Sequence, residues 1–380
     1  MLSFELTEEQ KQWQTKARDF AGGDAKLAAW EADQNPDFKH RFPWDIFKRM
    51  ASEGLAWLRV PQQYGGTGLD LLTTILVIEE LAAGDAGTAF TSMTCSVPPV
   101  AFAGTEEQKR KFLLPACNKE DPQLLAWGLT EAGAGSDVAG VMTRAKLEGN
   151  EYVLNGTKRF VTNGGIAAVY TFLARTDNGA DRPSFSAFLT PADTKGLSMG
   201  KVENKSGCRT SHTSDMILDN IRLPKENIIG GEGKGLSIVM GIFDWERLML
   251  GAIGVGVART AYEAALNFSK ERVKLSSVDQ QIVSFTLADM ITMIEASRLM
   301  AWRGCWLVDS GQPCGAEAAM TKILATDAAM KITTDAVQIL GIHAYTKEYP
   351  AEKCMRDAKV FQVGGGTNQI QRLVVSRSLV

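Results

Sequence analysis

The hydrophobic pattern of this chain changes its period twice, and that change limits the folds that the chain can adopt. Residues 7–116 carry helical signals, in Ala-, Glu- and Lys-rich stretches broken by short loops. Residues 124–229 instead contain short β-type segments separated by turns rich in Gly, Pro, Asp and Asn. Long helical patterns return from residue 236 to the end. This order predicts an α+β fold rather than an alternating βαβ fold.

The middle region carries a strong local signal, an Asn-Gly pair between two β-type segments. Tyr152–Leu154 and Thr157–Val161 flank Asn155 and Gly156, and an Asn-Gly pair in this setting favours a two-residue hairpin turn. We therefore expect a hairpin centred on these two residues. Further strands are expected at Val169–Leu173, Phe185–Leu189 and Met216–Leu218.

The same layout predicts three domains: an N-terminal helical domain at residues 1–122, a middle β domain at 123–229 and a C-terminal helical bundle at 230–380. The first helix should begin with a capping box formed by Thr7 and Gln10. Residues 247–272 are rich in small side chains, which favours close helix packing. The sequence has neither a GxGxxG motif after a first strand nor a Walker P-loop, so the two common nucleotide-binding motifs are absent.

The composition excludes several classes of function. The 380 residues have a formal net charge of −3, so no basic field would attract nucleic acid or an anionic membrane. No apolar run reaches the roughly 18 to 20 residues that span a bilayer, and the N-terminus has neither a signal-peptide nor a transit-peptide pattern. We therefore expect a cytoplasmic protein without nucleic-acid or membrane partners.

Cysteine and histidine usage indicates neither a disulfide framework nor a metal site. The six cysteines include no CxxC pair, and in a chain of this length that favours reduced, mostly buried thiols. The three histidines, His40, His212 and His343, lack metal-ligand spacing. We expect no metal.

Three long motifs resemble signatures of the acyl-CoA dehydrogenase family. The first is Gly128–Val138, which reads GLTEAGAGSDV, and the second is Asn155–Gly164, which reads NGTKRFVTNG. The third is Glu348–Lys359, which reads EYPAEKCMRDAK and leads into the segment Gly366–Arg372. Their order and spacing match the family over nearly the whole chain. The resemblance implies an N-terminal helical domain, a middle β domain and a C-terminal four-helix bundle.

The resemblance also implies an activity. Members of this family hold FAD between the β domain and the bundle, are usually homotetramers, and complete the FAD site from a neighbouring subunit; a homodimer is the alternative. A base removes the α proton of an acyl thioester while flavin N5 takes a hydride from the β carbon. An electron-transfer flavoprotein is the expected electron acceptor by the same resemblance.

The position of the base separates two subgroups of the family. In the larger subgroup a Glu stands directly before the Gly-Thr of the C-terminal motif, but this chain has Gly365 there. The isovaleryl and long-chain enzymes place the base at the start of the first bundle helix, directly before an Arg. Glu246 precedes Arg247 at that point, so we expect Glu246 to be the base. The alternative is a helix-start Glu that the helix dipole or Arg247 stabilises.

Other roles follow residue by residue from the resemblance. Thr162 would lie near flavin N5 and O4, Phe160 replaces a family Trp, and the Gly365 amide would donate to the thioester carbonyl. Ser136, Asp244 and Arg247 are expected to contact the CoA side of the substrate. Cofactor-binding roles are expected for Trp127, Leu129, Thr130, Gly135, Ser136, Phe160, Thr162, Arg272, Gln281, Gln338, Gly341, Thr367 and Gln369.

Two segments depart from the family pattern, and both belong to the expected contact with the adenosine half of a neighbour's FAD. Arg272 is followed by Val-Lys-Leu275-Ser276-Ser instead of the usual residues that contain Phe-Gly. The glycine-rich segment near the end of a later helix reads Gly341-Ile342-His343-Ala344, and Ile342 would crowd a close backbone approach. FAD binding or the quaternary arrangement should therefore differ, although the residues expected at the flavin ring are unaffected.

Several functions remain open from the sequence. The leading interpretation is dehydrogenation of a short- or branched-chain acyl-CoA. A second keeps the chemistry but takes an acyl or aminoacyl group tethered to a carrier protein in secondary metabolism. A third is a fold-related flavin oxidase or monooxygenase, and a fourth is a non-enzymatic scaffold. The sequence does not specify the acyl chain, the electron acceptor or the physiological direction.

Overall fold

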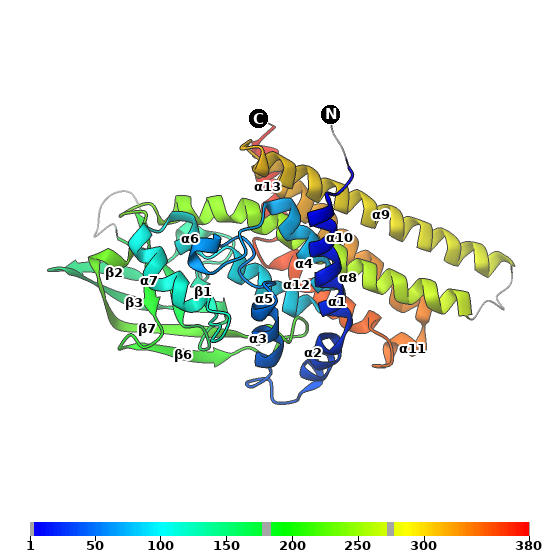
Figure 1. Ribbon diagram of the computed structural model, residues 1–380, viewed down its shortest axis with the longest axis horizontal. Coiled ribbons are helices and arrows are strands. Elements are labelled where there is room, and N and C mark those ends of the chain that lie inside the picture. Colours follow the sequence, from blue (N-terminus) through cyan, green and yellow to red (C-terminus); the bar gives the residue numbers. More distant parts are fainter. Residues whose placement is uncertain (1–3, 177–183, 272–276, 380) are drawn as a thin grey trace.

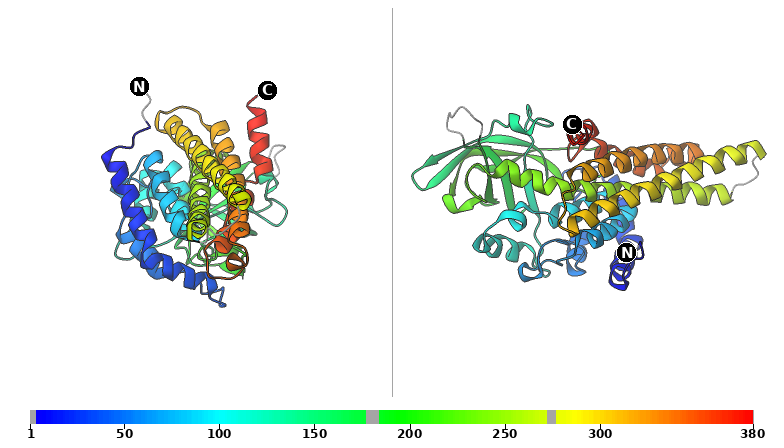
Figure 2. Two further views of the ribbon diagram at one scale, coloured as in Figure 1. Left: turned by 90° about the vertical axis from the view of Figure 1, so that its right-hand side faces the viewer. Right: turned by 90° about the horizontal axis from the view of Figure 1, so that it is seen from above.

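The computed structural model describes residues 4–176, 184–271 and 277–379, without the side chains of residues 277–280. A twisted sheet lies at one end of the molecule, and long helices extend to the other end (Figure 1). Most of the N-terminal helices lie in the middle of the molecule, between these two ends. Figure 2 shows the same arrangement from two further sides, and in its right-hand view the sheet and the far ends of the long helices lie at opposite ends. The observed order of helical, β and helical parts confirms the predicted α+β fold.

The N-terminal part is helical, and most residues of its helix α4 are buried. Gln10 N donates to Thr7 Oγ1 at 3.2 Å and Thr7 N donates to Gln10 Oε1 at 3.0 Å, which confirms the predicted capping box. The helices are α1 (Glu8–Gly22), α2 (Asp24–Gln34), α3 (Trp44–Ser52), η1 (Gln62–Tyr64), α4 (Leu71–Gly84), α5 (Ala86–Ser96), α6 (Pro99–Ala103) and α7 (Glu106–Ala116).

The middle part is a largely antiparallel sheet in the order β6-β7-β3-β2-β4-β5-β8, with β1 paired to β4 in parallel. Short 3₁₀ turns at η2 (Val138–Gly140) and η3 (Lys225–Asn227) connect some of these strands. The strands are β1 (Leu125–Gly128), β2 (Arg144–Glu148), β3 (Glu151–Thr162), β4 (Val169–Arg175), β5 (Phe185–Pro191), β6 (Leu197–Val202), β7 (Thr213–Pro224) and β8 (Ile228–Ile229).

The predicted hairpin at Asn155 and Gly156 is wrong, because β3 runs straight through both residues. The chain turns earlier, after Glu148, which pairs with Glu151 across the β2–β3 hairpin. A register shift between β3 and β7 lies at this point instead. Leu154 pairs with Ile221 and Gly156 with Leu218, so β7 carries the extra residue of a β-bulge opposite Asn155.

Tertiary contacts explain why the Asn-Gly pair does not turn the chain. Asn155 Oδ1 accepts a hydrogen bond from the backbone N–H of Asn220 on β7 at 2.9 Å. A Cβ on Gly156 would come under 3.0 Å from the side chain of Thr143, so this position needs glycine for a close approach. Contacts with neighbouring segments of the sheet therefore hold both residues within β3, and the local turn signal is overridden.

The C-terminal part is a set of long helices. Three of them, α8, α9 and α10, extend away from the sheet (Figure 1). A Cβ on Gly251, Gly254 or Gly256 of α8 would meet side-chain or backbone atoms of α10 or α4 at 3.0 Å or less, which confirms the predicted close packing. The helices are α8 (Gly235–Glu271), α9 (Ser277–Asp309), α10 (Gly315–Leu340), α11 (Ile342–Tyr345), α12 (Ala351–Val363) and α13 (Asn368–Arg377).

The third sequence motif lies where the three parts of the molecule meet. Lys353 of α12 is buried, and its ammonium group pairs with both Asp85, the N-cap of α5, and Asp357 at 2.6 Å each. Asp357 Oδ1 also accepts the backbone N–H of Cys208 from the β domain at 2.6 Å. This motif therefore ties the N-terminal helices, the sheet and the C-terminal helices together.

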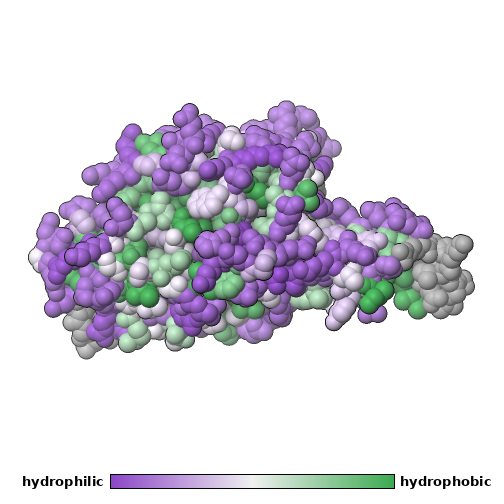
Figure 3. All heavy atoms as spheres, turned by 90° about the horizontal axis from the view of Figure 1, so that it is seen from below, coloured by the Kyte–Doolittle hydropathy of each residue, from purple (hydrophilic) through white to green (hydrophobic). Residues whose placement is uncertain are grey.

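The cysteines are buried, whereas several large apolar side chains are exposed. All six cysteines are free and buried, as predicted. Large exposed side chains lie toward the far end of the long helices, including Phe285, Ile342 and Tyr345. Figure 3 shows a mostly hydrophilic face, with apolar atoms over the body and near that far end. Among the described residues, no helix is long and apolar enough to cross a membrane.

Candidate active site

The loop after β1 runs beside β3 and brings predicted cofactor residues of both segments together. Arg159 N donates to the Thr130 carbonyl at 2.8 Å, and Asn163 Nδ2 donates to the Leu125 carbonyl at 3.0 Å. Both bonds join segments that lie more than twenty residues apart in sequence. We call the resulting set the platform: Trp127, Leu129, Thr130, Phe160 and Thr162.

Phe160 has an unusual backbone for its residue type. Its φ is +54°, in the left-handed region that non-glycine residues rarely adopt. The pairing of β3 with β7 shifts register between Lys158 and Val161, so Phe160 lies in a bulge, with 56% of its surface exposed. Bulges and strained backbones concentrate next to functional sites. An exposed aromatic ring held in this way suits stacking against a planar ligand.

A buried ion pair anchors the loop that carries Leu129 and Thr130. Lys158 is fully buried, and its Nζ donates to Glu131 Oε1 at 2.7 Å and to the Leu129 carbonyl at 3.2 Å. The Glu131 carboxylate also accepts the backbone N–H of Thr143 at 3.0 Å. Burial lowers the pKa of Lys158 to about 8, while Glu131 acts in the opposite direction. The platform therefore rests on a fixed scaffold.

Aromatic contacts connect the platform to α8. The ring of Trp127 lies 5.7 Å from the ring of Phe243 on α8, between ring centroids. The Arg247 guanidinium lies 5.8 Å from the centroid of the same Phe243 ring. The segment of α8 that contains Glu246 is therefore adjacent to the platform.

Glu246 occupies a different place in its helix from the one expected. We expected the start of the first bundle helix, but α8 begins at Gly235, about three turns earlier. A helix dipole acts mainly within the first turn, so it does not account for this Glu. Arg247 does not pair with it either: Arg247 Nη1 donates to Asp244 Oδ1 at 2.7 Å. Among the described residues, therefore, neither the dipole of a helix start nor an ion pair with Arg247 accounts for Glu246.

The Glu246 carboxyl group is buried and is not fully hydrogen-bonded within the described structure. The residue is 7% exposed, and within the described part of the chain its Oε2 has no hydrogen-bond partner. Desolvation raises the pKa of Glu246 from 4.5 to about 7, against smaller opposing effects of Arg247 and Lys322. A carboxyl group with a pKa near neutrality can accept a proton under ordinary cellular conditions.

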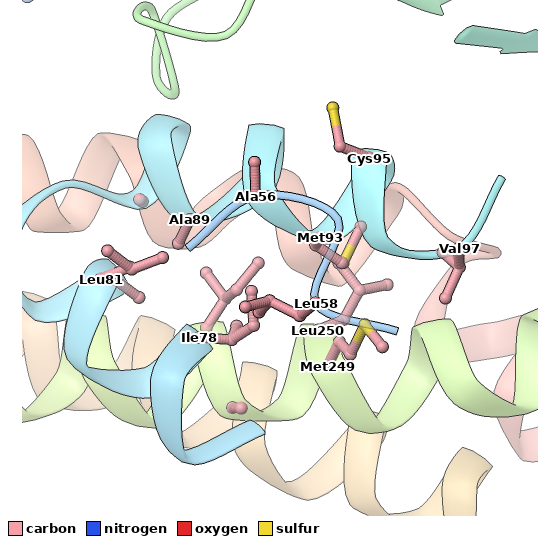
Figure 4. Close-up of a cluster of buried hydrophobic side chains, with 14 of the residues drawn as sticks. Ala56, Leu58, Ile78, Leu81, Ala89, Met93, Cys95, Val97, Met249 and Leu250 are labelled. Atoms are coloured by element: carbon pink, nitrogen blue, oxygen red, sulfur yellow. The ribbon is translucent and has the colours of Figure 1, made fainter. Parts of the chain in front are cut away.

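The glycine turn between α12 and α13 lies against the same face of α8. An ideal Cβ on Gly365 would lie under 3.0 Å from Leu250 Cδ1, and Leu250 follows Glu246 by one helical turn. Leu250 is 1% exposed, and Figure 4 shows it within a cluster of buried side chains from α4, α5 and α8. Glu246 and Gly365 are thus neighbours through Leu250.

Side chains hold the carbonyl groups of this turn. Lys322 Nζ donates to the Gly366 carbonyl at 2.6 Å, and Gln371 Nε2 donates to the carbonyls of Gly365 and Gly366 at 3.2 and 3.0 Å. Gly365 and Gly366 both have positive φ, at +64° and +78°. Within the described residues, the backbone N–H of Gly365 has no hydrogen-bond partner. It is therefore available as a donor to a ligand.

Three buried polar atoms on Glu246, on the adjacent Arg247 and on Gln371, which holds the turn, lack partners in the described structure: Glu246 Oε2, Arg247 Nε and Gln371 Oε1. Buried polar groups are normally satisfied, so such a set indicates a site that a ligand completes. Chemically, the site offers a buried proton acceptor, a free backbone donor and an aromatic platform with the Thr130 and Thr162 hydroxyls. This combination suits a planar cofactor beside a substrate that loses a proton.

The other predicted residues divide into two groups. Gly135, Ser136 and Gln369 are exposed, and Thr367 is the N-cap of α13, whose Oγ1 accepts the Ile370 N–H at 3.2 Å. Gln281, Gln338 and Gly341 are exposed on α9 or at the end of α10, toward the far end of the long helices and away from the platform (Figure 1). Arg272 and the altered Leu275-Ser276 segment lie outside the described residues.

His343, in the second altered segment, has aromatic neighbours. Its ring lies 5.6 Å from Phe268 and 6.3 Å from Tyr349, and its Nδ1 lies 3.8 Å from Glu348. The neighbouring Ile342 is 71% exposed. The expectation that these residues face a neighbour's FAD stays a prediction, because the structure contains one chain.

The sequence interpretation missed several residues of the site. Lys158 and Glu131 lie within the quoted motifs, and their charges inside β-type or Gly-rich segments were a usable signal. Lys322 lies between Thr321 and Ile323 in an Ala- and Thr-rich stretch of α10, and a charge in such a stretch was a further usable signal. Leu250 and Phe243 gave no signal, because apolar residues on a helix are ordinary core residues.

The sequence matches the models of three parts of one family. These are Acyl-CoA dehydrogenase, N-terminal domain, over residues 7–120; the middle domain, over residues 126–221; and the C-terminal domain, over residues 233–380. The family resemblance expected from the motifs is thereby confirmed.

Individual proteins are similar over the whole chain. A short-chain specific acyl-CoA dehydrogenase of Clostridium acetobutylicum is 39% identical, with 99% of each chain covered. The structure of butyryl-CoA dehydrogenase from Megasphaera elsdenii matches with a TM-score of 0.93 and 37% identity over 100% of both chains. The prolyl acyl carrier protein oxidase AnaB matches with a TM-score of 0.88 and 28% identity, over 99% of this chain and 100% of AnaB.

Proposed function

The chain belongs to the acyl-CoA dehydrogenase family of FAD-dependent oxidoreductases, and we propose that it dehydrogenates a short or branched acyl-CoA with Glu246 as the α-proton base. The observation that carries the choice of base is the buried, unpartnered Glu246 carboxyl beside a glycine turn. As part of the same proposal, the chain would belong to the isovaleryl and long-chain subgroup.

The residues of the platform fit the flavin ring of FAD. Trp127 and the exposed Phe160 provide aromatic surface, and the hydroxyl of Thr162 provides a polar contact on the same strand as Phe160. Bound FAD supplies the acceptor for the β hydrogen, which leaves as a hydride. Lys158 and Glu131 keep the loop of Leu129 and Thr130 in place against β3.

The residues around Glu246 perform the proton chemistry. Glu246 takes the α proton, and its raised pKa of about 7 makes it a stronger base than an exposed carboxylate. The Gly365 N–H donates to the thioester carbonyl, where negative charge develops as the proton leaves. The two groups act together, because removal of the weakly acidic α proton needs both a base and stabilisation of the resulting enolate.

Asp244 and Arg247 contribute to binding the substrate. Their ion pair fixes the Arg247 guanidinium next to Phe243, the residue of α8 that contacts Trp127 of the platform. Ser136 lies on the exposed loop after β1 and would contact the CoA portion. The remaining cofactor residues, Gly135, Gln281, Gln338, Gly341, Thr367 and Gln369 with Arg272, would hold the rest of FAD, with a neighbouring subunit contributing the far-end group.

The similar proteins favour a CoA thioester as the substrate. The relatives with the higher identities are named for short-chain acyl-CoA and butyryl-CoA. The match to a prolyl carrier-protein oxidase keeps a tethered aminoacyl substrate as the second candidate. An electron-transfer flavoprotein is the proposed acceptor, and a homotetramer, which is typical of this family, is the proposed assembly.

The test is a flavin-reduction experiment on the purified protein. Butyryl-CoA, isovaleryl-CoA and longer thioesters are added anaerobically to wild type and to Glu246→Gln, and the flavin absorbance is followed. One thioester should bleach the wild type. Glu246→Gln should bind the same thioester yet bleach slower by on the order of 10²-fold or more, as expected for loss of a positioned base.

The controls separate the alternatives. Asp45→Asn, at an exposed carboxylate of α3, should bleach like the wild type. A wild type that no CoA thioester bleaches, but that carrier-bound prolyl or acyl thioesters bleach, would replace the CoA substrate by a tethered one. Equal rates for wild type and Glu246→Gln would remove Glu246 from the mechanism. Peroxide formation without an added acceptor would indicate an oxidase.

A further inference from the structure

Lys322 is a buried cation that the proposed reaction does not yet use. It lies on α10 with 0% of its surface exposed. Its Nζ donates to the Gly366 carbonyl at 2.6 Å and to Asn368 Oδ1 at 3.0 Å. Both partners are neutral oxygens. The ammonium group is therefore held by the glycine turn and the start of α13 through neutral contacts.

Close helix packing places Lys322 near Glu246. A Cβ on Gly251 of α8 would come under 3.0 Å from the Thr321 side chain, so α10 approaches α8 at the residue before Lys322. Gly251 lies little more than one turn after Glu246. The charge of Lys322 accordingly acts on Glu246 across the helix interface, and the charge of Glu246 acts on Lys322.

Asn368 makes the position of Lys322 rigid. Asn368 Oδ1 accepts from Lys322, while Asn368 Nδ2 donates to Thr326 Oγ1 at 2.9 Å and to Asp327 Oδ1 at 2.7 Å. Gln371 holds the same glycine turn from α13. The ammonium group thus has one defined location, between the turn that carries Gly365 and the helix that carries Glu246.

We propose that Lys322 is a positioning residue that couples the two halves of the proton-transfer site, the Gly365 donor and the Glu246 base. Its hydrogen bond to the Gly366 carbonyl orients the peptide units of the turn, so that the Gly365 N–H faces the thioester carbonyl. Its positive charge stabilises the ionised form of Glu246, the form that accepts the proton. This inference rests on the proposed role of Glu246.

The charges around the pair determine the direction of the effect. Arg247 on α8 and Lys322 on α10 lower the pKa of Glu246, which burial raises to about 7. Burial lowers the pKa of Lys322 to about 8, with Glu246 and Asp327 opposing this and Arg247 adding to it. Removing the ammonium group leaves Glu246 with one nearby cation instead of two. Glu246 then ionises at a higher pH.

The experiment measures the rate of flavin reduction against pH in the FAD-bound enzyme, with saturating butyryl-CoA as the probe. The rate of wild type should rise with pH through a midpoint that belongs to the coupled pair. Lys322→Met should move this midpoint upward by about 1 unit, the lower end of the range for a nearby opposite charge. Its plateau rate should also fall, because the Gly366 carbonyl loses its donor.

Two further variants separate charge from structure. Lys322→Arg retains the charge and should keep the wild-type midpoint, even where its different shape lowers the plateau. Lys205→Met removes another lysine whose pKa burial lowers to about 8, but in the β domain. It should leave the midpoint unchanged. A merely structural role for Lys322 would reduce stability or plateau rate without moving the midpoint.

The outcomes distinguish this inference from the proposed function. An unchanged midpoint in Lys322→Met, with a midpoint that Glu246→Gln abolishes, would overturn the role of Lys322 alone. A wild-type midpoint that persists in Glu246→Gln would overturn the role of Glu246 and this inference with it. If Lys322→Met does not fold, Lys322→Arg decides: an upward shift of its midpoint despite the retained charge would refute the electrostatic coupling.

Discussion

The side chain of Leu250 occupies the space into which any side chain at Gly365 would project. An ideal Cβ on Gly365 would lie under 3.0 Å from Leu250 Cδ1, and Leu250 is 1% exposed in a packed cluster (Figure 4). Gly365 also has a φ of +64°, which L-residues adopt only with strain. A carboxylate therefore cannot be placed at 365 without a change at 250, and the base has to come from another backbone position.

This relationship predicts the behaviour of a relocated base. In a Glu246→Gln background, Gly365→Glu alone should not restore flavin reduction by butyryl-CoA, because Leu250 blocks the new side chain. Adding Leu250→Ala should restore the rate on the order of 10-fold or more, as for a base in roughly the right place. Single-turnover bleaching measures both. The single variant Leu250→Ala is the control for lost packing, which should reduce the stability by about 2–5 kcal/mol. If Glu246→Gln/Gly365→Glu recovered activity while Leu250 was retained, the steric block would be contradicted.

The buried Glu246 should make stability depend on pH. Burial raises the pKa of Glu246 from 4.5 to about 7, so the folded state binds this proton more tightly than the unfolded chain. The stability from this group is therefore present below pH 4.5 and is lost as pH rises to about 7. Because Gln does not titrate, Glu246→Gln should become more stable relative to wild type between pH 5 and pH 8, by up to about 3 kcal/mol.

Urea unfolding at several pH values measures this difference. Glu263→Gln is the matched control, because Glu263 lies on the same helix with 59% of its side chain exposed and should show no comparable trend. A difference between wild type and Glu246→Gln that does not change with pH would mean that Glu246 is hydrated in solution.

Replacing the strained Phe160 with glycine should have opposite effects on stability and on cofactor binding. Its φ of +54° suits glycine, and its ring is 56% exposed, so Phe160→Gly should leave the stability of the FAD-free protein unchanged or raise it by about 1 kcal/mol. The affinity for FAD should fall, because the stacking surface is lost. Flavin fluorescence titration and urea unfolding measure the two quantities.

Phe160→Trp is the control for this experiment, because it keeps an aromatic ring at the bulge. It should bind FAD about as well as the wild type. If Phe160→Gly also bound FAD as well as the wild type, the platform would not be the flavin site.

The three-part junction at Lys353 predicts a large loss of stability. Lys353→Met leaves the buried carboxyl groups of Asp85 and Asp357 without their cation and should cost about 3–5 kcal/mol. Adding Asp85→Asn and Asp357→Asn should recover part of this loss, because the uncompensated charges disappear. Lys331→Met, which removes an exposed ion pair with Asp335, should change the free energy of unfolding by less than about 1 kcal/mol. A similarly small effect of Lys353→Met would contradict the junction.

Local sequence signals were correct where local structure decides. The capping box of Thr7 and Gln10, the small residues of α8 and the change from helical to β periodicity all appear in the structure as predicted. The Asn155-Gly156 signal failed, because Thr143 next to β2 and Asn220 on β7 contact these two residues and hold them within β3. Contacts across a sheet can override a turn preference that is worth little by itself.

The site shows the same division. The resemblance pointed to Glu246 and Gly365 as partners, but it placed Glu246 at a helix start, and α8 begins well before it. Neither Leu250, which fills the space beside Gly365, nor Lys322, which holds the turn, was identified from sequence. Both act through residues more than forty positions away, and no pattern within one helix records such a neighbour.

The sequence by itself determined the order of helices and strands, the family and the residue types available for proton transfer, because periodicity and motifs are properties of neighbouring residues. Only the tertiary structure decided which of those residues are buried, which polar atoms lack partners, and which helix faces meet. The pKa of Glu246 is the clearest case. It depends on desolvation by side chains from several helices, and desolvation arises only when those helices pack together.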